Sequence, residues 1–341
     1  MATIKDIADK VGVSPATVSR ILNHDDSISF SADTKLKVFQ TVEELEYVTV
    51  KERKRKKAQQ KKYSIGFAEW VTESGMLNDP YYLYLQDMLE QESRQLNIHM
   101  FQLKRQEDTF INPSNDRLDG IIVIGFYKEQ DIEPLKKLSE NIVFIDYSIY
   151  DHIYDSVKPN YKLGLTEALD YLTGLGHAKI GYLTKTPIEK HIHSFVDKRG
   201  EIIQKYLEEK DIFEPEYFIR KEDTGNYAKL GYDTGLELIR ENKLPTALIT
   251  HNDTMAIGVI RALHEAGISV PDQISIIGIN DLPTSKYIFP SLSTIRTPFG
   301  DMAKCAINLL TERIDCSSKY TRKLLIQTKF IARNSSGPLN S

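Results

Sequence analysis

Cysteine is almost absent from this chain of 341 residues, which holds only Cys305 and Cys316. Two cysteines provide neither a disulfide framework nor the spacing of a metal-binding cluster. No apolar run approaches the ~20 residues that a membrane-spanning helix needs, and the N-terminus has no secretion signal. These absences favour a reduced, cytoplasmic protein without a membrane anchor.

The common signatures of catalysis and of cofactor binding are also missing. The sequence has no phosphate-binding loop and no G-x-S-x-G nucleophile motif. His191 and His193 come nearest to a metal-binding pair, but no third ligand is near them, which favours a surface loop. The run GLGH (174–177) precedes a predicted strand instead of following one, so a helix end explains it. We therefore expect no enzyme activity, no metal and no cofactor.

The N-terminal run TIKDIADKVGVSPATVSRILN (3–23) predicts two short helices joined by a tight turn. Thr3 is suited to cap the first helix together with Asp6, and Gly12 can end it in the left-handed backbone region. Ser14 is suited to cap the second helix, with Pro15 at its first position. The first helix has one apolar face at helical spacing, formed by Ile4, Ile7, Ala8 and Val11.

The second helix buries Val18, Ile21 and Leu22 and turns small or polar residues outward. Short hydroxyls can reach DNA phosphates, and an arginine can contact guanine O6 and N7 together. The alternative is a helical hairpin that only packs. Capping and periodicity alone leave both interpretations open.

A third helix is predicted from an N-cap at Ser31 to about Tyr47, with Leu36, Phe39, Val42 and Leu45 inward. The run 3–23, followed by SADTKLKVFQTVEELEY (31–47), resembles the headpiece of the lactose/galactose repressor family of bacterial transcription factors. This resemblance implies a helix-turn-helix DNA-binding headpiece over residues 1–47.

The resemblance also implies a role for each exposed headpiece residue. Pro15 and Ala16 would touch base edges, and Arg20 would contact a guanine. The expected phosphate contacts are Thr3, Ser14, Thr17, Ser19, Asn23, Ser31, Thr34 and Tyr47.

Residues 48–62 form a basic linker. The segment 51–62 carries eight Lys or Arg and one Glu, whereas the whole chain has a net charge of −4. Basic charge beside a DNA-reading motif strengthens phosphate binding, although a solvated linker is the alternative. Lys56 stands where most family members have a leucine that wedges into the minor groove. We therefore expect charge contacts to DNA from Lys51 and Arg53 instead of intercalation.

From Tyr63 onward short apolar strands alternate with helices, which predicts doubly wound α/β layers with buried parallel strands. The predicted strands are 63–68, 98–103, 120–125, 141–146, 179–184, 217–221, 246–250, 273–279 and 324–331. The predicted helices are 80–96, 130–140, 161–175, 195–210, 227–241, 252–266 and 299–314.

The resemblance extends over this region and implies the type I periplasmic-binding-protein-like fold: an α/β core of two doubly wound parallel-sheet subdomains. Crossovers are expected near residues 160, 293 and 322. The first subdomain would then comprise 63–160 and 293–322, and the second 161–292 and 323–333. The polar tail 334–341 is expected to be disordered.

Ligands of open α/β sheets bind beyond the carboxyl ends of the strands, where this sequence places polar and aromatic residues. Carboxylates, amides, a guanidinium and aromatic rings suit a sugar, because planar polar groups bind hydroxyls and rings pack on the pyranose. Capping or turn roles are the alternative. The expected effector-binding residues are Trp70, Asp79, Tyr81, Asp146, Arg199, Asn252, Asn280 and Phe299. Many relatives have Asp where this chain has Asn280.

The resemblance implies a homodimeric repressor of a sugar-utilisation operon, nearest to galactose and galactoside repressors. Its partners would be double-stranded operator DNA and a sugar that releases it. A regulator controlled by a protein partner or a co-repressor is the alternative. The helices at 80–96 and after Asn252 are expected at the dimer interface.

Overall fold

The computed structural model describes residues 3–22, 30–45, 47, 63–69, 79–106, 109–114, 117–148, 150–186, 197–316 and 320–338. The chain divides into two compact units, residues 1–62 and residues 63–341. In the described residues, no helix combines the length and the apolar character needed to cross a bilayer.

The first unit is built on three helices, α1 (Ile4–Val11), α2 (Pro15–Leu22) and α3 (Ala32–Glu44). Their shared core contains Ile7, Ala8, Val18, Ile21, Val38 and Tyr47. The inward face predicted for α3 was partly wrong, since Leu36 is 57% exposed and Phe39 is 41% exposed. The helix instead buries Val38 and Thr41 and packs Val42 and Leu45 against the core. These four positions share one helical face, and Leu36 lies on the opposite side.

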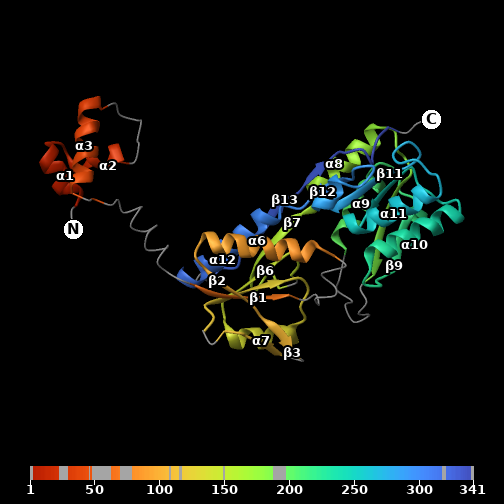
Figure 1. The fold of residues 1–341 in the computed structure, drawn as a ribbon, viewed down its shortest axis with the longest axis horizontal. Helices are drawn as coiled ribbons and strands as arrows, with labels where there is room; N and C mark the ends of the chain where they lie inside the picture. Colours follow the sequence, from red (N-terminus) through yellow and green to blue (C-terminus); the bar gives the residue numbers. More distant parts are fainter. Residues whose placement is uncertain are drawn as a thin grey trace. The chain divides into compact units, whose positions relative to one another are not determined.

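Residues 63–341 form two sheets of six strands, each covered by helices on both faces (Figure 1). The first sheet has the order β13-β7-β6-β5-β1-β2, and all of its neighbouring strands are parallel. Its strands are β1 (Ser64–Glu69), β2 (His99–Gln102), β5 (Gly120–Ile124), β6 (Ile142–Ile145), β7 (Asp155–Asn160) and β13 (Lys323–Gln327). All residues of β5 and β6 are buried, as expected for parallel strands covered on both sides.

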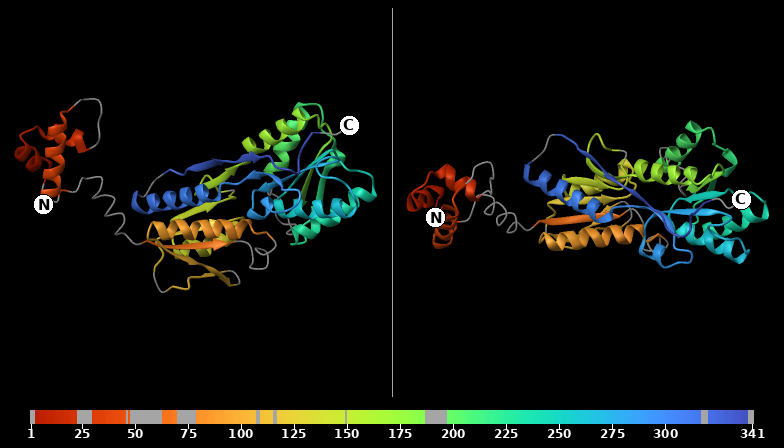
Figure 2. Two further views of the ribbon diagram at one scale, coloured as in Figure 1. Left: turned by 45° about the horizontal axis from the view of Figure 1, so that its top comes forward. Right: turned by 90° about the horizontal axis from the view of Figure 1, so that it is seen from above.

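Helices α6 (Tyr81–Gln95) and α12 (Phe299–Cys316) cover one face of this sheet side by side (Figure 2). Helix α7 (Glu129–Leu138) packs on the other face with the hairpin of β3 (Lys104–Gln106) and β4 (Thr109–Ile111). The first sheet is therefore doubly wound, as predicted.

The second sheet has the order β14-β12-β11-β10-β8-β9. Its strands are β8 (Ile180–Thr186), β9 (Phe218–Glu222), β10 (Ala247–Thr250), β11 (Ser275–Asn280), β12 (Ser293–Arg296) and the antiparallel β14 (Lys329–Ile331). Helices α8 (Tyr161–Gly174) and α9 (Lys198–Glu209) cover one face. Helices α10 (Tyr227–Arg240) and α11 (Asp253–Glu265) cover the other. The predicted α/β core of two doubly wound subdomains is confirmed.

The chain passes between the sheets three times, but two crossings differ from the prediction. The first follows β7 at Asn160, as expected. Strand β12 still belongs to the second sheet, so the next crossing comes at about residues 297–298 and not at 293. The single strand predicted over 324–331 is two strands in different sheets, with the last crossing at Thr328 instead of 322. Neither β7 nor β12 was predicted, because β7 contains several polar residues and β12 has only four residues.

The C-terminal segment up to Pro338 is packed, so the prediction of a disordered tail was wrong there. Ser335 is fully buried, and its hydroxyl donates to the Ile276 carbonyl at 2.6 Å. The Gly337 carbonyl lies 3.0 Å from the buried ring nitrogen Nε2 of His177. The small polar residues of this segment favoured a disordered tail in the sequence, but in the fold they pair with buried groups.

Helices α10 and α11 pack closely because each has a glycine at the contact. A Cβ on Gly258 would lie 2.0 Å from the Ala228 carbonyl oxygen, and one on Gly231 would lie 2.1 Å from the Met255 carbonyl oxygen. Both neighbours are backbone atoms, which cannot yield without separating the helices.

Gly258→Ala is therefore expected to destabilise the core by about 1–3 kcal/mol through overpacking. Gly174→Ala is the control, because a Cβ at the end of α8 meets nothing within 4 Å. This control should change stability by about 1 kcal/mol at most. Urea unfolding of the full chain followed by circular dichroism measures both effects. Equal midpoints for the two variants would refute the close contact.

Candidate functional site: a helix-turn-helix face and a cluster of polar side chains from two sheets

The ends of α1 and α2 are fixed as the sequence predicts. Thr3 accepts from the Asp6 amide at 3.3 Å, and the Asp6 carboxylate accepts from the Thr3 amide at 2.8 Å. Gly12 ends α1 with φ of 77°. The Ser14 hydroxyl accepts from the Thr17 amide at 3.1 Å and so caps α2. These caps fix the turn that separates the two helices.

The outward face of α2 carries the predicted base-contacting residues. Pro15, Ala16 and Arg20 are exposed, whereas Val18 and Ile21 are buried in the headpiece core. The geometry therefore presents one arginine and two small residues on the same side of a capped helix. Such a helix can enter the major groove of DNA.

Several predicted phosphate contacts already have a structural role as caps. The hydroxyls of Ser14 and Thr17 lie 2.9 Å apart, and those of Ser31 and Thr34 lie 2.7 Å apart. The Tyr47 side chain is 8% exposed and packs in the headpiece core. Ser19 is half-buried on α2. Asn23, Lys51, Arg53 and Lys56 lie outside the described residues.

In the core, four predicted effector residues meet at the carboxyl end of the first sheet. The Tyr81 hydroxyl donates to Asp146 Oδ1 at 2.7 Å, and the Tyr81 amide donates to Asp79 Oδ1 at 3.2 Å. The Phe299 ring meets the Tyr81 ring edge-on, with centroids 5.1 Å apart. Burial raises the pKa of both Asp79 and Asp146. Asp146 also has a left-handed backbone with φ of 75°, which is uncommon for a residue with a side chain.

On the second sheet, Arg199 is held by a network that the sequence did not reveal. Its Nε donates to Asp197 Oδ1 at 3.2 Å, and its Nη1 donates to the His251 carbonyl at 3.0 Å. Asp197 also caps α9 and accepts from Tyr182 and Thr184, each at 2.7 Å. The Arg199 guanidinium and these hydrogen bonds keep the pKa of Asp197 well below its usual range despite burial.

His251 is neutral in this network. Burial, followed by the charge of Arg199, lowers the pKa of its imidazole to about 4, although Asp197 acts in the opposite direction. An imidazole that stays neutral beside Arg199 adds no second positive charge. Asp197 could have been found as the cap of a predicted helix, and His251 as the residue that directly follows a predicted strand.

One hydrogen bond joins the two halves of the site. The Asn252 Nδ2 donates to Asp79 Oδ2 at 3.2 Å, while the Asn252 Oδ1 accepts from the Met255 amide and caps α11. Lys185 and Arg199 both act on Asp79 through their charge. Residues from two different sheets thus converge on the Asp79 carboxylate.

Asn280 joins the site indirectly. It has a left-handed backbone with φ of 122°, and its side-chain oxygen accepts from the Thr297 hydroxyl at 3.3 Å. Thr297 interacts with Tyr161, and the Arg199 guanidinium lies 5.4 Å from the centroid of the Tyr161 ring. Tyr161 was not predicted as a site residue, because an aromatic residue at the start of a helix is more often part of the hydrophobic core. Trp70 lies outside the described residues.

This arrangement suits a hydroxyl-rich ligand. Half-buried carboxylates can accept from sugar hydroxyls and an amide can donate to them, and the rings of Tyr81, Tyr161 and Phe299 offer apolar surface. In the part of the chain that the structure describes, no three His, Cys, Asp or Glu side chains are placed to bind a metal ion.

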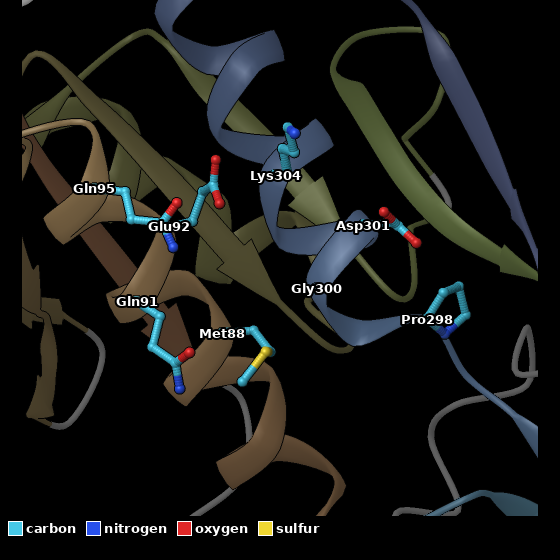
Figure 3. Close-up of a pocket in the computed structure, with 8 residues that line it drawn as sticks. All are labelled: Met88, Gln91, Glu92, Gln95, Pro298, Gly300, Asp301 and Lys304. Carbon is cyan, nitrogen blue, oxygen red and sulfur yellow. The ribbon is translucent and has the colours of Figure 1, made fainter.

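A separate pocket of about 340 Å³ lies between α6 and α12 (Figure 3). Glu92 and Asp301 line it together with Lys304 as its one cation. Its other lining residues are Met88, Gln91, Gln95, Pro298 and Gly300. A pocket with two carboxylates and one ammonium does not favour a phosphate group.

Two family models match different parts of the chain. The model described as bacterial regulatory proteins, lacI family, matches residues 3–49, and the periplasmic binding protein-like domain matches residues 169–336. The fold resembles a crystal structure of the lac repressor dimer bound to operator and the anti-inducer ONPF, with a TM-score of 0.64 and 23% identity over 98% of each chain. It also resembles the transcriptional regulator CelR in complex with cellobiose, with a TM-score of 0.67 and 16% identity over 98% of this chain and 100% of the other.

Full-length relatives share more of the sequence. The transcriptional regulator GalR of Lacticaseibacillus casei is 30% identical over 98% of this chain and 100% of its own length. The transcriptional regulator GanR of Bacillus subtilis (strain 168) is 29% identical over 98% of this chain and 99% of its own length. The chain therefore belongs to the LacI family of bacterial transcriptional regulators, which are DNA-binding proteins and not enzymes.

Proposed function

We propose that the chain is a sequence-specific repressor of a galactose or galactoside utilisation operon, released from its operator by a sugar bound between the two sheets. It acts as a homodimer in the cytoplasm. The names of the GalR and GanR relatives support the choice of operon. The hydrogen bond between Asn252 and Asp79 supports the mechanism, because it connects groups from the two subdomains.

In this proposal, the sugar hydroxyls replace the direct hydrogen bond between Asn252 and Asp79 with hydrogen bonds to the sugar. A hydroxyl placed between Asp79 and Asn252 accepts from the amide and donates to the carboxylate, while Arg199 binds a neighbouring hydroxyl. The two subdomains then change their separation, and with it the spacing of two headpieces in a dimer. By linkage, the sugar and the operator weaken each other by the same factor.

Within the headpiece, Arg20 reads a guanine, and Pro15 and Ala16 contact thymine methyl groups. Phosphates are bound by Thr3, Ser14, Thr17, Ser19, Asn23, Ser31, Thr34 and the Tyr47 hydroxyl, and by Lys51 and Arg53 of the linker. A hydroxyl that caps a helix can still bond a phosphate, because its oxygen has a second lone pair and its proton can rotate.

Arg199→Ala is expected to raise the sugar concentration needed for half-release of the operator about tenfold or more, since hydrogen bonds to a charged group contribute ~1.5–3 kcal/mol. Operator affinity without sugar should stay unchanged. Fluorescence anisotropy of a labelled duplex from the chain's own upstream region, at fixed salt, measures both quantities during titration with galactose, lactose and glucose.

Arg261→Ala is the matched control, because Arg261 is an exposed arginine of the same subdomain that pairs with Glu265 at 2.9 Å. If Arg199→Ala does not fold, Asp79→Asn replaces it in the test, because asparagine has nearly the same shape as aspartate and lacks its negative charge. If the wild-type chain binds the duplex and none of these sugars releases it, the effector is not one of them. Control by a protein partner or a co-repressor then replaces the present proposal.

Arg20→Ala is expected to weaken operator binding by about 1–3 kcal/mol, because a bidentate guanine contact is lost. Binding to a duplex of scrambled sequence should change far less. Lys37→Ala removes one positive charge from the exposed side of α3, where Lys37 pairs with Asp33, and serves as the electrostatic control. An unchanged ratio of operator to scrambled-duplex affinity in Arg20→Ala would exclude the proposed base contact.

A further inference from the structure

Two consecutive residues at the carboxyl end of β11 have unusual backbone conformations. Asn280 has φ of 122° and Asp281 has φ of 56°, values that residues with side chains uncommonly adopt. Such conformations persist only where the surrounding structure holds them, and they cluster at ligand-binding sites. The contacts of Asp281 provide that support.

Two arginines bind the carboxylate of Asp281, whose side chain is only 4% exposed. Arg296 Nε donates to Oδ2 at 2.7 Å, and Arg333 Nη2 donates to Oδ1. The Arg296 side chain is 49% exposed, whereas that of Arg333 is 12% exposed. An exposed ion pair contributes little, but removing the buried partner leaves a buried carboxylate without compensation. Arg333 is therefore the main restraint on Asp281.

Arg333 is itself fixed by the segment that follows β14. Its Nη1 donates to the Leu292 carbonyl at 2.6 Å, and its amide donates to the Ser293 hydroxyl at 2.8 Å. Strand β14 pairs with β12 in the second sheet, with Ile331 beside Thr294. The guanidinium thus connects the strand pair of β12 and β14 with the turn after β11.

The turn that Arg333 holds leads into the candidate effector site. Asn280 is 3% exposed and directly precedes Asp281. Its Oδ1 accepts from the Thr297 hydroxyl at 3.3 Å, and its carbonyl accepts from the Thr297 amide at 3.2 Å. Thr297 interacts with Tyr161, whose ring centroid lies 5.4 Å from the Arg199 guanidinium. These bonds use the oxygens of Asn280 and leave its side-chain NH2 group as a donor for a sugar hydroxyl.

We propose that Arg333 is a positioning residue of the effector site: its ion pair with Asp281 holds the adjacent Asn280 where the NH2 group donates to a sugar hydroxyl. This inference rests on the function proposed above. It extends the site to a residue near the C-terminus that touches no sugar. Without the guanidinium the turn is released, so Asn280 has to be ordered when the sugar binds, which weakens the affinity.

The test is a double-mutant cycle between Arg333→Gln and Asn280→Ala, with the galactose affinity of the full chain measured by isothermal titration calorimetry. Each single variant should bind galactose about fivefold more weakly, as expected for the loss of one hydrogen bond. Because Arg333 acts through Asn280, the double variant should also lose about fivefold, whereas independent effects multiply to about 25-fold. Lactose replaces galactose in every titration if the wild-type chain binds only lactose.

Arg313→Gln is the matched control, because the Arg313 side chain is 18% exposed and donates to the fully buried Asp155 at 3.4 Å. Asp155 begins β7, so this ion pair lies at the amino end of the first sheet, away from the site. The control should lose stability in thermal unfolding and keep galactose affinity within about twofold. If Arg333→Gln does not fold, Asp281→Asn replaces it, because asparagine tolerates the left-handed region and lacks the charge that Arg333 binds.

The outcomes separate this inference from the proposed function. Galactose affinity within about twofold of wild type in either single variant, or a loss of about 25-fold in the double variant, overturns the positioning role. The proposed function survives these results, because the wild-type chain still binds galactose. If neither galactose nor lactose binds the wild-type chain, the proposed function and the positioning role are both wrong.

Discussion

A buried guanidinium sets the main constraint on the candidate site. Arg199 has a side chain only 14% exposed, and a charge so far from water requires a partner of opposite sign. Asp197 supplies that partner, and Tyr182 and Thr184 hold its second oxygen. His251 avoids adding charge by remaining neutral. Because each of these side chains is fixed by another, the guanidinium is positioned before any ligand arrives.

The same principle does not extend to Asp79 and Asp146 beside the first sheet, since neither forms an ion pair with a lysine or arginine in the part of the chain that the structure describes. Burial raises the pKa of Asp79 and Asp146, and the cations that lower it act from a distance or from the other subdomain. Asp79 is therefore best stabilised when the second subdomain is close. The half of the site around Arg199 is thus fixed and neutralised by its own ion pair with Asp197. The ionisation of Asp79, in the other half, depends instead on how near Lys185 and Arg199 of the second subdomain lie.

Local rules predicted much of this molecule, and the errors arose where distant parts of the chain meet. The caps at Thr3 and Ser14 depend on residues three positions away, and the positions of Asp146 and Asn252 follow from the ends of buried strands. The prediction of the inward face of α3 was partly wrong because it relied on Leu36 and Phe39, which are large and apolar. The headpiece core instead contains Val38 from this helix. Strand β12 was missed because it has only four residues, Ser293–Arg296, of which two are small and polar. Asp197 and His251 were missed because a position at a helix start or after a strand does not by itself show that the residue binds Arg199.

Asn252 shows why a capping role and a ligand-binding role need not exclude each other. Its side-chain oxygen caps α11, which any of Ser, Thr, Asp or Asn could do. Its amide nitrogen remains as a donor and reaches Asp79 on the other side of the site. Of these four residues, only Asn has a separate NH2 group left after capping. The choice of Asn at this position is therefore explained by the contact between the subdomains and not by the helix.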